Sequence, residues 1–166
     1  MTPPDPLALY HARELLEGRG LAVLAAWVIG NLLVSGYYMA HINRRDAAHH
    51  FHFMNVAWAL INGGLAAWGI LNLYRAVPSG LSLAAAAAAH HHDERLFFVN
   101  AGLDVLYVLA GRWLCRRAAA PGAGNSVRLA GFGRSLKLQG GFLLVFDASM
   151  WALLYATAGP FRAIGL

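Results

Sequence analysis

Polar side chains occur near the centres of the four most apolar stretches of the chain, where ionisable groups are costly to bury. These central residues are Asn31, Asn62, Asp104 and Asp147. An aspartate at the centre of a bilayer costs roughly 2.5 to 3.5 kcal/mol, so we expect these side chains to face one another rather than lipid. Two ionised carboxylates at one depth repel, and a proton held by one or a cation between them relieves the repulsion. The residues therefore predict proton carriage or cation binding.

A structural interpretation of the same residues stands beside this one. A neutral hydrogen-bonded network of Asp, Asn and Tyr side chains would fix helix register or an oligomer interface, and it would transport nothing. The residue types alone leave both interpretations open.

Helical spacing extends the central residues into polar stripes, because residues three, four or seven positions apart share one face of a helix. In the last stretch, Gln139 is displaced to one side of the face that carries Asp147. We expect the stripes to face one another and to form a shared interior site. Its further polar members are Trp27, Ser35, Tyr38, Asn55, Asn100, Tyr107 and Gln139.

Four histidines cluster between the first two apolar stretches, in the segment HINRRDAAHHFH. They are His41, His49, His50 and His52. Imidazoles can bind a metal ion or ligate haem, but this spacing matches neither a HExxH helix nor the histidine boxes of membrane desaturases. The other interpretation is a set of interfacial loop histidines. His52, three residues before Asn55, could also extend a polar stripe as the mouth of a proton path.

The apolar blocks that carry these residues predict an all-α polytopic membrane protein with a four-transmembrane-helix bundle. Hydrophobic residues make up 58% of the chain and charged residues only 13%, far from the roughly 25% charged of soluble proteins. The blocks are continuous rather than alternating, which excludes a barrel. About 20 helical residues cross a hydrocarbon core of about 30 Å. The predicted spans cover about 21–41, 53–74, 96–114 and 138–158.

Two units are predicted along the chain: residues 1–20 and the transmembrane domain 21–166. Asp5 followed by Pro6 is typical of a helix start, and the first unit is predicted to be a short amphipathic helix on the membrane surface that ends at Gly18-Arg19-Gly20. Acidic residues before the first apolar block predict an uncleaved signal anchor.

The segments between the spans also carry signals. Val77-Pro78-Ser79-Gly80 is predicted to stop one helix, and Ser82 to cap the next, which runs through an alanine-rich stretch into the third span. The Gly-rich segment 118–133 is predicted to be a loop.

Basic residues predict the orientation. Five lie on the side of the termini, namely Arg13, Arg19, Arg75, Arg95 and Arg162. Eight lie on the other side, which is therefore expected to be cytoplasmic, with both termini outside a bacterial cytoplasmic membrane.

No cluster of basic residues interleaved with aromatic side chains supports nucleic-acid binding. The single cysteine, Cys115, excludes an intramolecular disulfide.

The segments FHFMNVAWALINGGLAAWG, FVNAGLDVLYVLAG and LQGGFLLVFD resemble a family of small four-span bacterial membrane proteins of unknown function. The residues that carry the resemblance, in a defined order, are Asn100, Gly102, Asp104, Gln139, Gly140 and Asp147. The resemblance covers nearly the whole chain. It implies the four-span architecture and brings no activity with it.

Three functions compete at this stage. The first is proton- or cation-linked transport or permeation through the bundle, as a single chain or a homo-oligomer. The second is an accessory or assembly subunit of a larger membrane complex, with the polar network as interhelical glue and basic loops on anionic lipid. The third is a redox protein that binds haem or a metal ion through its histidines. No Ser-His or HExxH-type arrangement supports an enzyme, and no cofactor is assigned beyond that third possibility.

Overall fold

The computed structural model describes residues 5–75, 80–163 and 165. It is 87% helical, and the described residues contain no strand. The helices are α1 (Pro6–His41), α2 (Ala47–Leu73), α3 (Leu83–Ala119), α4 (Ser126–Thr157) and the short α5 (Gly159–Arg162). The first four are each long and apolar enough to cross a membrane. The predicted all-α fold with four such helices is confirmed, and each predicted span lies within one helix to within one residue at its ends.

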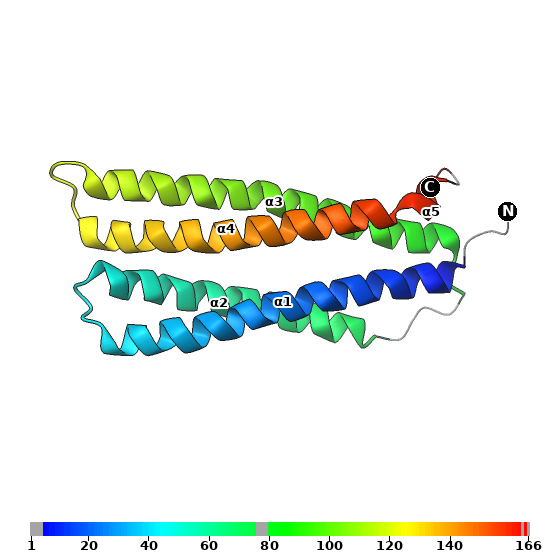
Figure 1. The fold of residues 1–166 in the computed structure, drawn as a ribbon, viewed down its shortest axis with the longest axis horizontal. Coiled ribbons are helices and arrows are strands. Elements are labelled where there is room, and N and C mark those ends of the chain that lie inside the picture. The colour runs from blue at the N-terminus through cyan, green and yellow to red at the C-terminus, as the bar shows by residue number, and fades with distance from the viewer. Residues whose placement is uncertain (1–4, 76–79, 164, 166) are drawn as a thin grey trace.

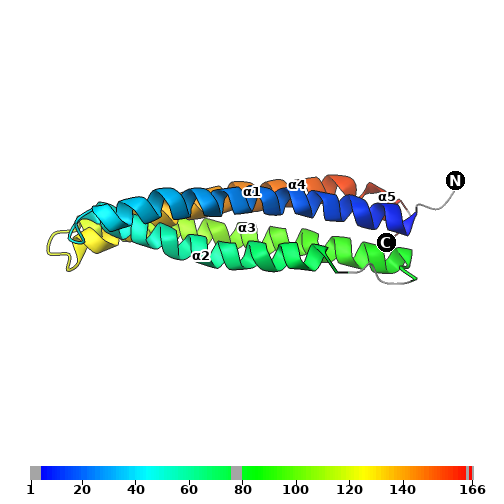
Figure 2. The ribbon, with the colours of Figure 1, turned by 90° about the horizontal axis from the view of Figure 1, so that it is seen from below.

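The helices form two antiparallel hairpins that lie side by side (Figure 1). In one, α1 packs along α2; in the other, α3 packs along α4; the packing of α2 on α4 joins them. The loops 42–46 and 120–125 lie at one end, which we call the loop end. Both chain termini lie at the other, the terminal end (Figure 2).

Side chains start two of the helices as the sequence predicts. At α1, the carboxylate of Asp5 accepts a hydrogen bond from the amide of Leu7 (3.0 Å), and Pro6 opens the first turn. At α3, the hydroxyl of Ser82 accepts one from the amide of Ala85 (3.1 Å). Each cap satisfies one amide that the first helical turn leaves free. The predicted stop at Val77-Pro78-Ser79-Gly80 falls largely on residues 76–79, outside the described residues.

The prediction of a separate surface helix that ends at Gly18-Arg19-Gly20 is wrong. Helix α1 runs without interruption from Pro6 to His41. Gly20 instead permits close packing, because a Cβ there would lie 2.7 Å from the sulfur of Met150 in α4. The turns of α1 before Gly20 therefore form one continuous helix with the apolar turns that follow.

The predicted loop 118–133 is wrong in its second half. Helix α4 begins at Ser126, so only residues 120–125 connect it to α3. Gly131 lies inside α4, and a Cβ there would lie 2.5 Å from the carbonyl oxygen of Ala47 in α2. Gly131 and Gly133, which resembled loop residues, are positions where two helix backbones approach each other.

Helices α1 and α3 are longer than a bilayer requires. At 36 and 37 residues, they extend for about 54 Å at 1.5 Å per residue, against a hydrocarbon core of about 30 Å. In α1 the charged residues all lie before Leu21. In α3 a first group of charged residues ends at Arg95, directly before the apolar stretch that starts at Leu96. The terminal end of the bundle therefore consists of helical turns more polar than the apolar zone beside them.

The outer surface of the bundle is apolar. Large side chains such as Leu33, Leu71 and Val145 are about two-thirds exposed, whereas the buried residues include several asparagines and aspartates. Contiguous apolar surface of this kind is rare on monomeric proteins in water, and a polar interior with an apolar exterior suits a lipid environment.

Candidate functional site

Seven side chains from α1, α2 and α4 form a connected hydrogen-bonded set, which we call the amide network. Its members are Trp27, Asn31, Ser35, His52, Asn55, Ser135 and Gln139. The network lies between the two hairpins, toward the loop end.

Gln139 is the centre of the amide network and is fully buried. Its Nε2 donates to Oδ1 of Asn31 (2.9 Å) and to Oδ1 of Asn55 (3.0 Å). Its Oε1 accepts from Nε1 of Trp27 (2.9 Å). A single side chain of α4 thus pairs with partners on both helices of the other hairpin. Both polar ends of its amide are hydrogen-bonded, as a buried amide requires.

Asn55 extends the network toward the loop end. Its Oδ1 accepts a second hydrogen bond from the hydroxyl of Ser135 (2.6 Å), and its Nδ2 donates to Oγ of Ser35 (3.3 Å). The same Ser35 oxygen lies 3.1 Å from Nδ1 of His52. A continuous chain of hydrogen bonds therefore runs from His52 to Gln139.

Asp104 of α3 and Asp147 of α4 form a second buried group, which we call the carboxyl pair. The two carboxyl groups lie close enough to interact with each other, and both residues are buried. Neither forms an ion pair with any described residue. Because two ionised carboxylates in contact repel, the pair requires a shared proton or a cation.

Close helix packing brings the carboxyl pair together. Gly140 of α4 faces Asp104, since a Cβ at Gly140 would lie 3.2 Å from the backbone oxygen of Asp104 and 2.9 Å from Cβ of Tyr107. One oxygen of Asp104, Oδ2, is buried and has no hydrogen-bond partner among the described residues. This oxygen is therefore free to accept a hydrogen bond.

An apolar layer separates the carboxyl pair from the amide network. Leu24, Ala66 and Leu143 form a buried cluster. Leu143 follows Gln139 by four residues and precedes Asp147 by four, so each group lies about 6 Å from it along α4. The polar stripes predicted to meet in one interior site are therefore divided into two groups.

The remaining predicted polar residues lie outside both groups. Asn62 is buried, and its Nδ2 has no partner among the described residues. Asn100 is partly buried. Tyr107 packs edge-on against Trp58 with ring centroids 4.9 Å apart. Tyr38 is 45% exposed and stacks on the ring of His52.

The histidines of the loop end do not converge on one point. Nδ1 of His41 lies 2.7 Å from the carbonyl oxygen of Tyr37, whereas His50 contacts the ring of Phe132 and the ring of His49. Within residues 5–75, 80–163 and 165, no group of three His, Cys, Asp or Glu side chains could hold a metal ion. A haem or metal site at these histidines remains a prediction, which an absorption spectrum with elemental analysis of the purified protein would test.

Sequence reasoning missed one member of the amide network. Ser135 is fully buried, but it lies in front of the predicted fourth span, next to the segment interpreted as a loop. The sequence did contain a signal for this residue, because Ser135 precedes Gln139 by four residues and therefore lies on the same face of the helix. Gln139 itself, expected beside the main polar face of α4, is the central residue of the network.

The fold and these buried groups define a class: small all-α proteins with four apolar helices, an apolar exterior and a polar interior. The chain belongs to a family of unknown function (DUF6992), whose match covers residues 23–148. This stretch includes the amide network and the carboxyl pair. Comparisons with curated proteins and with solved structures give no match.

Proposed function

We propose that this protein is inserted in the bacterial cytoplasmic membrane and carries protons or cations through its helical bundle, as a single chain or a homo-oligomer. The proposal rests on the carboxyl pair. Asp104 and Asp147 lie close enough to interact, are buried, and have no basic partner among the described residues. A buried acidic pair inside an apolar bundle is a site where a proton or cation gains stability and from which it can leave.

The groups around the carboxyl pair support a route with one barrier. On the loop side, the amide network supplies hydroxyl, amide and imidazole groups from His52 to Gln139. Between that network and the pair, the apolar layer at Leu24 and Leu143 would exclude water. Apolar constrictions of this kind gate permeation pathways by dewetting. In this proposal the described conformation is a closed one, and opening separates Leu24 from Leu143.

Flux measurements on purified protein in liposomes test this function. Vesicles with the wild-type protein should pass protons or a monovalent cation faster than empty vesicles, and Asp104→Asn and Asp147→Asn should each lower the rate at least tenfold. Asp46→Asn is the matched control, because Asp46 is exposed and its carboxylate makes no capping hydrogen bond. Wild-type vesicles as tight as empty ones would contradict the proposal.

The orientation needs its own test. We propose that both termini lie outside the membrane and the two basic loops in the cytoplasm, from the eight basic residues against five. Alkaline phosphatase fused to the C-terminus should be active and a fluorescent protein dark. The reverse result would invert the orientation without affecting the carboxyl pair.

A second candidate function is an accessory or assembly subunit, and the amide network favours it. Its hydrogen bonds join three helices through buried and partly buried side chains, which is what an interhelical structural network requires. In this case the protein should co-purify with a larger membrane complex after mild solubilisation. Deleting it should lower the yield of that complex, while vesicles of the isolated chain stay tight.

A further inference from the structure

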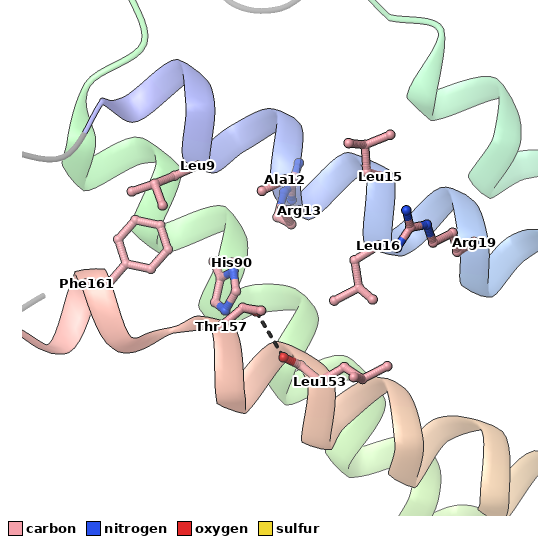
Figure 3. A pocket seen from close by; sticks show the side chains of 10 residues that line it. All are labelled: Leu9, Ala12, Arg13, Leu15, Leu16, Arg19, His90, Leu153, Thr157 and Phe161. Atoms are coloured by element: carbon pink, nitrogen blue, oxygen red, sulfur yellow. Dashed lines mark hydrogen bonds between the residues drawn. The ribbon is translucent and has the colours of Figure 1, made fainter.

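A cavity of about 370 Å³ opens at the terminal end of the bundle, away from both buried groups. Helices α1, α3, α4 and α5 contribute its walls (Figure 3). Its size falls in the range of 300 to 1,000 Å³ that is typical of ligand sites. The lining residues are Leu9, Ala12, Arg13, Leu15, Leu16, Arg19, His90, Leu153, Thr157 and Phe161.

The chemistry of this lining is asymmetric. Most of the wall is apolar, the charged lining residues are Arg13 and Arg19, and no lining residue is acidic. Arg19 is exposed and forms no ion pair with a described residue. Arg19 therefore presents uncompensated positive charge beside an apolar surface, whereas the charge of Arg13 is shared with Asp93 and Glu17.

The polar groups of the wall are held in fixed positions. Nη1 of Arg13 lies 2.6 Å from Asp93 and 3.4 Å from Glu17, while its Nε is buried with no partner among the described residues. Nε2 of His90 lies 2.9 Å from the carbonyl oxygen of Leu154 and donates to it. Because these contacts fix both side chains, little conformational entropy would be lost when a ligand binds.

The cavity lies at the edge of the apolar zone. Arg19 precedes by two residues the start of the apolar stretch at Leu21. In a bilayer this level corresponds to the headgroup region, where arginine meets phosphate and neighbouring leucines meet the first acyl carbons. Figure 3 shows Leu16 pointing from α1 toward α4, where Leu153 lies.

We propose that this cavity is a specific site for one anionic phospholipid, with the phosphate on Arg19 and Arg13 and part of one acyl chain against Leu16 and Leu153. The positive charge of Arg19 selects an anionic occupant, since Arg19 forms no ion pair with a described residue and no lining residue is acidic. A second hollow, which shares Leu15 and Arg19 with this cavity, carries Glu14 in its lining and suits an anion less. The site is independent of the carboxyl pair and of any transport.

Thermal unfolding of the purified full chain in a neutral detergent tests the proposal. Dioleoyl phosphatidylglycerol should raise the melting temperature more than dioleoyl phosphatidylcholine, and native mass spectrometry should retain one phosphatidylglycerol per chain. Inorganic phosphate alone should raise it little. If phosphate is as effective as phosphatidylglycerol, the site takes a free anion and the lipid assignment is wrong.

Two variants separate a specific site from general attraction to basic residues. Arg19→Gln should weaken phosphatidylglycerol retention about tenfold, since a charge-assisted hydrogen bond contributes about 1.5 to 3 kcal/mol. Arg95→Gln is the matched control, because Arg95 is exposed and lies outside the cavity lining. Leu16→Trp, which fills the cavity, should weaken retention while both arginines remain. Equal retention in Arg19→Gln and Arg95→Gln would overturn the proposal.

Discussion

The amide network and the carboxyl pair both place polar side chains on the buried face of α4, with Gln139 and Asp147 eight residues apart. They differ in how those side chains are satisfied. Gln139 uses both ends of its amide in hydrogen bonds of 2.9 to 3.0 Å to three partners. The carboxyl pair has no basic partner among the described residues, and one of its oxygens is unpaired.

This difference indicates different roles. A satisfied buried network stabilises one arrangement of helices and resists change. An unsatisfied buried acidic pair destabilises the fold unless it binds a proton or a cation. Such pairs are typical of functional sites, where binding offsets the lost stability. The first group is therefore expected to control stability and the second to control activity, and the following variants test that division.

The largest effect is expected from Gln139→Leu. The substitution leaves Nε1 of Trp27 and Oδ1 of Asn31 without their partners, so the free energy of unfolding should fall by about 2 to 4 kcal/mol. Reversible unfolding in mixed micelles measures this change. Ser149→Ala is the control on the same helix, because that hydroxyl is exposed and bonds only to the carbonyl of Val145. Similar values for the two variants would remove the distinction between the groups.

Next in size is Gly131→Ala, which tests the helix packing beside the amide network. The new Cβ would clash with the backbone of α2 at Ala47, and such overpacking costs about 1 to 3 kcal/mol. Gly141→Ala on the same helix meets nothing within 4 Å and should stabilise by about 0.5 to 1 kcal/mol. The melting temperatures of the two variants should move in opposite directions, and a shift of the same sign would show that backbone contact is not the cause.

A smaller loss of stability is expected from Arg13→Gln, a substitution at the terminal end. This change leaves the neighbouring carboxylates of Glu17 and Asp93 without their cation. Because these side chains are partly accessible to water, the loss should be about 1 to 2 kcal/mol, below the 3 to 5 of a fully buried pair. Burial, together with the neighbouring Asp93, raises the pKa of Glu17 to about 8. The deficit should shrink as the pH falls below that value, because protonation of Glu17 removes its repulsion with Asp93. A deficit that is constant between pH 8 and pH 4 would exclude this explanation.

The smallest effect on stability is expected from Asp147→Asn. The amide has nearly the same volume and can donate to the free Oδ2 of Asp104, so the free energy of unfolding should change by less than about 1 kcal/mol. The same variant should lose ion or proton flux in liposomes. A large loss of stability with unchanged flux would assign the carboxyl pair to structure and would favour the accessory-subunit role.

Much of the fold followed from the sequence, because it depends on local properties. The four apolar stretches, the Asp5 and Ser82 caps and the absence of strand patterning needed only composition and helical spacing. The errors in the helix boundaries have one cause. Gly18, Gly20, Gly131 and Gly133 were interpreted from local propensity as helix ends or loop, whereas they lie inside helices. Tertiary packing overrides propensity there, since Gly20 and Gly131 have a partner helix where their side chain would be.

The sequence also identified many of the polar residues that lie inside, because their depth within an apolar stretch and their helical face are both readable. Tyr38, predicted to lie inside, is 45% exposed. Asn31, Asn55, Gln139, Asp104 and Asp147 are all buried as expected. Their partners were not readable, since hydrogen bonds between helices depend on the rotation and offset of each helix against its neighbours. The sequence by itself thus determined four apolar helices that enclose a polar interior. Only the tertiary structure decided that one polar group is closed by hydrogen bonds, that the other is left open, and that Leu143 lies between them.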